Sequence, residues 1–188
     1  MPTAEEICNK AMVILGASMI GSLAAPTTPN ARTLALLYPM ARNSEIRKRR
    51  WRFAKQTDAL PKDATWTGTY PRAYRYQLHA ATVRTSLEKY SDWIIQGGYV
   101  YTDCNEATLY VEVFRSDVNT ALYDPCFCDA LAARIADDAC ETITQSNTKK
   151  ADARKAYREA IATAGRINAF EIGPVEPPFG SWAQQLGG

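Results

Sequence analysis

Residues 42–55 read RNSEIRKRRWRFAK, and this stretch decides where the chain stops being helical. Seven of its fourteen residues are basic and Glu45 is its only acid, so it carries a charge of +6 in a chain whose net charge is +2. Successive helical residues are about 100° apart, so the side chains of Arg47 to Arg50 would point all around a helix axis. Such a helix cannot pack on any side without burying a charge. We therefore expect the helix to end near Arg50 and to continue as an extended strand.

The two aromatic residues at the end of this stretch predict an anchor. In an extended chain Trp51 and Phe53 share one side of the backbone, and Arg52 faces the other. The basic residues then form a patch, and these are Arg42, Arg47, Lys48, Arg49, Arg50 and Arg52. Three interpretations of the patch are open: a phosphate-binding surface, an interface with the acids of a neighbouring subunit or partner, and a solvated helix end. Five phosphate contacts would give a slope of about −4.5 in log K against log salt.

The segments on either side of this stretch indicate helices. Thr3 and Glu6 have the spacing of a capping box, and Gly16 is a stop signal. Thr28-Pro29 and Asp124-Pro125 each combine an N-cap residue with proline at the first helical position. The helix that begins at Pro125 is expected to run to about Ser146, and a fourth helix is expected over residues 150–170.

Residues 55–123 indicate strands. DWIIQGGYVYT (92–102) is predicted to fold back on itself at Gly97-Gly98, and ATLYVEVF (107–114) is a further strand. The predicted fold class is mainly α with β. It is a four-helix bundle core formed by residues 1–54 and 124–170, with a β-rich lobe inserted at 55–123. An extended C-terminal tail follows at 171–188.

The residues that could support catalysis or metal binding do not form a motif. The five cysteines are an odd number in a long chain, which argues against a disulfide framework and favours structural thiols. His79 is the only histidine, and Asp137 and Asp138 project in different directions from a helix. No apolar run is long enough to span a bilayer, and the acidic N-terminus does not indicate export. We therefore expect no enzyme activity, no cofactor and no membrane association.

Three stretches, in this order along the chain, resemble a known family. They are ICNKAMVILGASMIGSL (7–23), ARTLALLYPMARNSEIRKRRWRFAKQTDAL (31–60) and DCNEATLYVEVFRSDVNTALYDPCFCDALAARIADDACETITQS (103–146). Together with the closing helix and tail, they are similar to the head-to-tail adaptor family of short-tailed double-stranded DNA phages, the tail tubular protein A group. The chain departs from that pattern at Arg50, where the family often has proline, and at Arg52, where a neutral polar residue is common.

The resemblance implies a structural virion protein at the head–tail junction, assembled in the host cytoplasm. Copies would form a ring, twelve-fold in the family, below the portal protein. The ring would extend the channel through which double-stranded DNA passes, and it would dock the tail nozzle. Any role of the basic patch is our own inference, and we favour contact with the next subunit or the portal. The tail is expected to dock on the portal through Pro177, Pro178, Phe179, Trp182 and Leu186.

Two alternatives belong to other functional classes. A sequence-independent DNA-binding protein would use residues 42–55 and would show a steep salt dependence. A virion-associated glycan hydrolase would need a pair of carboxylates from distant positions, and no motif in the sequence points to such a pair.

Overall fold

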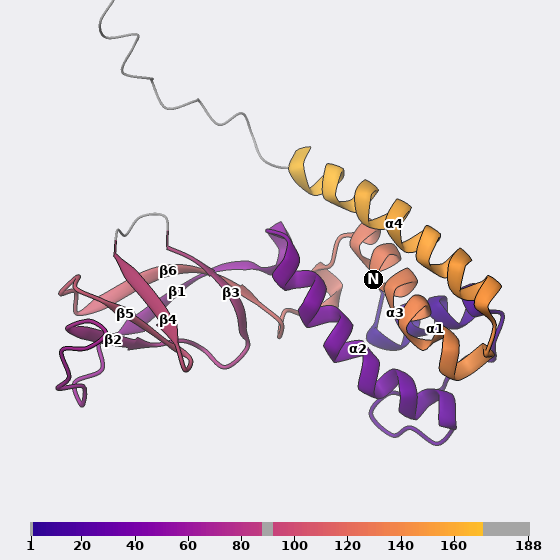
Figure 1. Ribbon diagram of the computed structural model, residues 1–188, viewed down its shortest axis with the longest axis horizontal. Coiled ribbons are helices and arrows are strands. Elements are labelled where there is room, and N and C mark those ends of the chain that lie inside the picture. Colours follow the sequence, from indigo (N-terminus) through magenta and orange to yellow (C-terminus); the bar gives the residue numbers. More distant parts are fainter. Residues whose placement is uncertain (1, 88–91, 171–188) are drawn as a thin grey trace, which may run out of the picture.

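The computed structural model describes residues 2–87 and 92–170. The described part of the chain contains four helices and two small antiparallel sheets of three strands each. This mixture confirms the prediction of helices together with strands. Figure 1 shows an elongated molecule in which the helices gather at one end and the strands at the other. The predicted tail, residues 171–188, lies outside the described residues.

Three of the four helices begin at the residues that the sequence predicts, and the fourth begins at Asn147, three residues before the predicted start. The four helices are α1 (Ala4–Leu15), α2 (Pro29–Lys48), α3 (Pro125–Thr144) and α4 (Asn147–Phe170). The side chains of Thr3, Thr28 and Asp124 accept hydrogen bonds from backbone amides in the first turns of α1, α2 and α3. These bonds satisfy amide groups that a helix leaves without an internal partner. Gly16 ends α1 with a φ of 62°, in the left-handed region that favours glycine.

Helix α3 lies between the other helices and contacts all three. Its apolar repeat is buried at Phe127, Leu131, Ile135 and Ala139, and Ile143 at its end is half-buried. On α4 the buried residues are two alanines, Ala153 and Ala164, whereas Tyr157, Ile161 and Ile167 are half-buried. The small alanine side chains allow α4 to approach α3 closely, which leaves the larger residues at the margins of the contact.

The chain does not continue as a strand directly after α2, which corrects our prediction. Helix α2 ends at Lys48, and residues Arg52–Ala54 form a short 3₁₀ turn, η1, before strand β1 (Lys55–Pro61) begins. The amide of Ala54 donates to the carbonyl of Trp51 at 3.2 Å, which closes this turn. The turn keeps the expected pattern of burial, since Trp51 is buried, Arg52 exposed and Phe53 half-buried.

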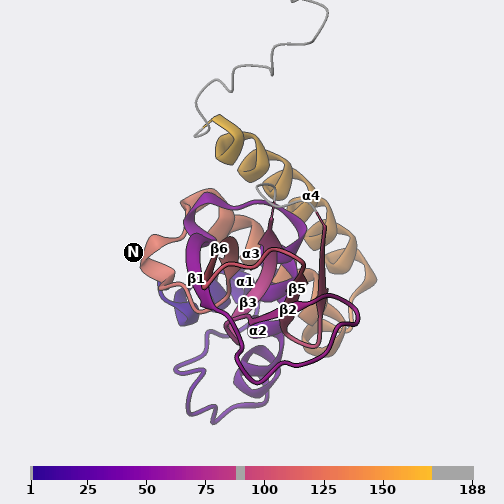
Figure 2. The ribbon, with the colours of Figure 1, turned by 90° about the vertical axis from the view of Figure 1, so that its left-hand side faces the viewer.

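The six strands form two sheets between α2 and α3. The first has the order β1-β6-β3, with β6 at Thr108–Arg115 and β3 at Thr82–Ser86. The second has the order β2-β5-β4, with β2 at Tyr74–Gln77, β5 at Tyr99–Thr102 and β4 at Trp93–Gln96. Strands β4 and β5 form the predicted hairpin, and Gly97 and Gly98 have φ values of 58° and 81° at its turn. Figure 2 shows the strands in front of the helices.

Two separate hydrophobic clusters stabilise the described residues. The larger one joins the four helices to Trp51, Tyr123 and Phe114. The smaller one lies among the strands and includes Tyr76, Val100 and residues of β6. Strand β6 contributes to both, because Phe114 belongs to the helical cluster and Leu109, Val111 and Val113 belong to the strand cluster. The end of α2 therefore lies where these two clusters meet.

Candidate functional site at the end of α2

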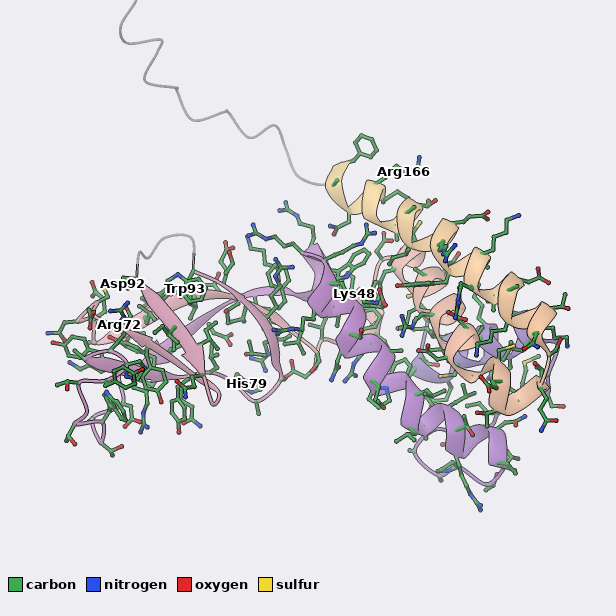
Figure 3. The ribbon with its side chains drawn as sticks, in the orientation of Figure 1. Lys48, Arg72, His79, Asp92, Trp93 and Arg166 are labelled. Atoms are coloured by element: carbon green, nitrogen blue, oxygen red, sulfur yellow. The ribbon has the colours of Figure 1, made fainter. Side chains whose placement is uncertain are left out.

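The predicted basic patch lies where the chain passes from the helices to the strands, and Figure 3 labels Lys48 at this end of α2. Arg47, Lys48, Arg50 and Arg52 are exposed, whereas Arg42 and Arg49 are half-buried. We call this region, residues 42–55, the basic junction.

A buried carboxylate lies at the centre of the basic junction. Glu45 is 1% exposed, although it stands in the most basic stretch of the chain. Its Oε1 accepts hydrogen bonds from Lys48 Nζ at 2.5 Å and from the Tyr157 hydroxyl at 2.9 Å. Its Oε2 is buried and has no hydrogen-bond partner among the described residues. Sequence reasoning missed this group, and the only signal for it was a single acid three residues before a lysine.

The Glu45 carboxylate stabilises the charged form of Lys48. Burial lowers the pKa of Lys48, but the hydrogen bond and the charge of Glu45 together raise it by more. The pKa of Lys48 therefore lies above the ordinary lysine value. Burial raises the pKa of the Tyr157 hydroxyl, and the neighbouring Glu45 raises it too. Tyr157 therefore remains a neutral hydrogen-bond donor to Glu45. Lys48 therefore forms an ion pair with a buried carboxylate, although its own side chain is exposed.

Trp51 is fully buried and holds the start of the strand region against the helices. Its indole Nε1 donates to the backbone carbonyl of Glu45 at 2.8 Å. Its ring packs edge-on against Phe127 of α3, with 4.8 Å between centroids, and stacks with Phe53 at 6.0 Å. Phe53 in turn lies 4.9 Å from the ring of Tyr123. This aromatic cluster fixes the direction in which the chain leaves α2.

The arginines of the basic junction are positioned largely by neutral groups. Arg47 donates to the carbonyl of Val83 on β3 at 2.5 Å, and the Arg42 side chain donates to Asn43 at 3.1 Å. The guanidinium of Arg49 packs against Gly165 of α4, and a Cβ at that position would lie 1.8 Å from Nη1 of Arg49. Within residues 2–87 and 92–170, none of Arg42, Arg47 and Arg49 forms an ion pair with a carboxylate.

The last turn of α4 is tied to the same region. The amide side chain of Asn168 accepts from the backbone N–H of Arg52 at 3.0 Å and donates to the backbone carbonyl of Arg50 at 2.9 Å. The backbone is therefore held on both sides of Trp51. The guanidinium groups of Arg42, Arg47 and Arg49, which have no carboxylate partner among the described residues, can bind carboxylates or phosphates of another molecule.

His79 lies at some distance from the basic junction, on the strand region, as Figure 3 shows. It lines an open groove of about 540 Å³ together with Asp58 and Arg115. Its Nδ1 accepts from the backbone N–H of Ala81 at 3.1 Å, and its Nε2 lies 3.1 Å from the Arg115 guanidinium. Arg115 also pairs with Asp117 at 2.5 Å. Among the described residues, neither ring nitrogen is hydrogen-bonded to a carboxylate that could orient the imidazole as a general base.

The two adjacent aspartates of α3 do not converge on one point. Asp138 pairs with Arg134 at 2.8 Å, one turn earlier on the same helix, and Asp137 pairs with Arg154 of α4 at 3.5 Å. Each carboxylate therefore has a separate arginine partner. This arrangement supplies no pair of carboxylates for hydrolysis of a glycan.

The five cysteines are free thiols, and three of them, Cys8, Cys128 and Cys140, are buried. Burial and, to a smaller extent, Glu5 raise the pKa of Cys8 to about 12. Burial, followed by the charge of Asp129, raises the pKa of Cys128 to about 11. These two thiols are therefore protonated near neutral pH and are poor nucleophiles. The described residues contain no group of three or more histidine, cysteine or acidic side chains arranged to hold a metal ion.

The predicted tail residues Pro177, Pro178, Phe179, Trp182 and Leu186 lie outside the described residues. A scan against models of protein families found no match, and a comparison with curated proteins found none either. In residues 2–87 and 92–170, each helix is too short or too polar to cross a membrane.

Proposed function

We propose that this chain is a structural head-to-tail connector of a phage virion and not an enzyme. Copies would form a closed ring below the portal protein, extend the channel for double-stranded DNA and dock the tail nozzle. The proposal starts from the resemblance of three stretches, in order, to the adaptor family. It is also supported by three arginines of the basic junction, Arg42, Arg47 and Arg49, which contact neutral groups and have no carboxylate partner among the described residues.

The main structural support for this proposal is the basic junction, because its positioned arginines are suited to contact with another protein. Arg47 and Arg49 are held by a carbonyl and by a helical glycine, so little freedom is lost when they meet carboxylates of another subunit. Each copy in a closed ring uses two different surfaces, and polar pairs across such a contact select the correct partner and orientation. We infer that the basic junction is one of these surfaces or contacts the portal.

The architecture that we propose for this role has two parts. The four helices act as one bundle, and the strands between α2 and α3 act as an inserted lobe. The tail at 171–188 would reach the portal, where the many copies of a ring would add their weak individual contacts. The site of action would be the head–tail junction of the virion, after assembly in the host cytoplasm.

A second candidate is a DNA-binding protein without sequence preference. The observation that favours it is the same absence of carboxylate partners around Arg42, Arg47 and Arg49 in the described residues, since phosphates would also suit these guanidinium groups. We rank it below the connector because a channel through which DNA slides gains little from tight phosphate contacts.

Electron microscopy of the purified chain mixed with the portal ring encoded in the same genome tests the first proposal. We expect portals extended by a collar of added density. Arg47→Glu should weaken the collar, whereas Arg32→Glu should not, because Arg32 is an exposed arginine in the first turn of the same helix. Bare portals with the native chain would overturn the connector proposal.

Titration with short duplex DNA at several salt concentrations tests the second. A DNA-binding protein should show a steep dependence of log K on log salt, and Arg47→Ala should reduce the slope by about 0.9. A connector should bind such DNA weakly as a free chain, with little change on substitution.

A further inference from the structure

Strand β4 has an open edge. It pairs with β5 on one side, and among the described residues no strand pairs with its other side. The opposite edge of the same sheet is partly covered, because Tyr76 of β2 forms a bridge with Lys62 and the amide of Asp63 donates to the carbonyl of Arg75 at 2.9 Å. The two edges of this small sheet are therefore unequal, and β4 forms the uncovered one.

The side chains of β4 are unusual for an open edge. Trp93, Ile94 and Ile95 are 39%, 38% and 41% exposed, and the strand contains no charged residue. Natural proteins protect open edges with lysine, proline, bulges or covering segments, because an apolar edge pairs with other strands. Figure 3 labels Trp93 at the start of this strand. The composition of β4 therefore suits a strand that is covered by another chain.

The hairpin fixes which backbone groups face the open side. Gly97 and Gly98 both have positive φ, as the two-residue type I′ turn requires, so the flanking pair Gln96 and Tyr99 exchanges hydrogen bonds. The pattern alternates along an antiparallel pair, so the N–H and C=O groups of Trp93 and Ile95 point away from β5. Four backbone groups are thus presented at the edge, and no backbone group of the described residues pairs with them there.

These groups are spaced so that β4 can pair with itself. If two copies meet around a two-fold axis at Ile94, Trp93 of one copy lies opposite Ile95 of the other, and each such pair exchanges two hydrogen bonds. Ile94 then lies opposite Ile94 of the second copy. Asp92 lies opposite Gln96, so no like charges face each other. Pairs of aromatic and β-branched residues are favourable in antiparallel sheets.

The apolar surface of the sheet also continues across such a contact. Ile95 lies in register with Val100 and Tyr76, which are fully buried in the strand cluster. A second copy would extend this row past the edge of the sheet and cover Trp93 and Ile95. We propose that β4 is a docking strand for β4 of a second copy, which gives a continuous sheet of six strands. This inference goes beyond the proposed function and does not depend on it.

Two measurements on the full-length chain, without portal or DNA, test the inference. Sedimentation should show weak, reversible dimers, since two four-residue strands form a small contact. Hydrogen exchange followed by nuclear magnetic resonance should show that the Trp93 and Ile95 amides are protected increasingly as protein concentration rises. A monomer at every concentration, or rapid exchange at both amides in the dimer, would overturn the inference.

A charge swap identifies the contact. Ile94→Lys and Ile94→Glu should each associate at least about tenfold more weakly, because like charges would face each other at the axis, and an equal mixture should restore dimers. Tyr110→Lys is the matched control, since Tyr110 is 59% exposed on β6, in the other sheet. Dimers that resist both substitutions, or a mixture that stays monomeric, would show that another surface is used and would overturn the inference. The amide spectra confirm that each variant is folded.

Discussion

The indole of Trp51 donates a hydrogen bond to the backbone carbonyl of Glu45, and both residues are buried at the end of α2. The bond joins the last turns of the helix to the segment that leads into β1. It spans the most basic part of the chain, with Arg47, Lys48, Arg49 and Arg50 between the two residues. The exposed arginines therefore lie next to a buried and hydrogen-bonded segment of the chain.

Trp51→Phe should destabilise the fold. The variant removes the hydrogen bond to Glu45 and leaves a small cavity beside Phe127, at an expected cost of about 1–3 kcal/mol in the free energy of unfolding. Urea denaturation followed by circular dichroism measures it. Trp93→Phe is the matched control, since Trp93 is 39% exposed, and it should change the free energy by about 0.5 kcal/mol or less. Equal effects at the two positions would contradict the anchoring role.

Glu45→Gln should also destabilise the fold, although it changes few atoms. The neutral amide keeps an acceptor for Tyr157 but removes the charge that Lys48 contacts, and it adds an N–H₂ group in a buried position. We expect a loss of about 1–3 kcal/mol. Glu112→Gln is the control, because Glu112 pairs with Lys55 at 2.6 Å but is 44% exposed, and its loss should be below about 1 kcal/mol. A Glu45→Gln variant that is as stable as the native chain would show that the buried charge is dispensable.

Stability should fall in acid through Asp63. Hydrogen bonds from Thr65 and then from Arg75 lower the pKa of this carboxyl to about 2. A lowered pKa in the folded state contributes stability above the unfolded value, about 3.9, and this contribution is lost as the pH falls from about 4 to 2. Urea midpoints measured across this range should decline less in Asp63→Asn than in the native chain. Identical declines would assign the acid sensitivity to other carboxyls.

Gly165→Ala should raise stability slightly and displace Arg49. Alanine favours a helix over glycine by up to about 1 kcal/mol. The added methyl group conflicts only with the guanidinium end of Arg49, which would have to leave its position against α4. Thermal denaturation measures the gain, and Ala162→Gly, at an exposed position of the same helix, should show a loss of similar size. A destabilised Gly165→Ala variant would show that the packing of Arg49 on α4 matters more than helix propensity.

Local signals in the sequence predicted the elements that depend on neighbouring residues. The caps at Thr3, Thr28 and Asp124 and the turn at Gly97-Gly98 each act over a few residues, and all are present in the structure. Strand β3 was not predicted individually, because it is held by pairing with β6, which follows much later in the chain.

The buried state of Glu45 could not be predicted for a similar reason. One of its hydrogen-bond partners, Tyr157, is supplied by α4, 112 residues away, and no pattern near Glu45 in the sequence indicates that contact. The 3₁₀ turn at Arg52–Ala54 likewise depends on the aromatic cluster that receives Phe53. The sequence indicated which residues were basic or apolar, and long-range packing decided which of them are exposed.

The hydrogen bonds of Asn168 have a mechanical consequence. This residue is hydrogen-bonded to the backbone on both sides of Trp51, and α4 ends two positions later, at Phe170. A displacement of the last turn of α4 would therefore also move the backbone of Arg50 and Arg52, which leads into β1.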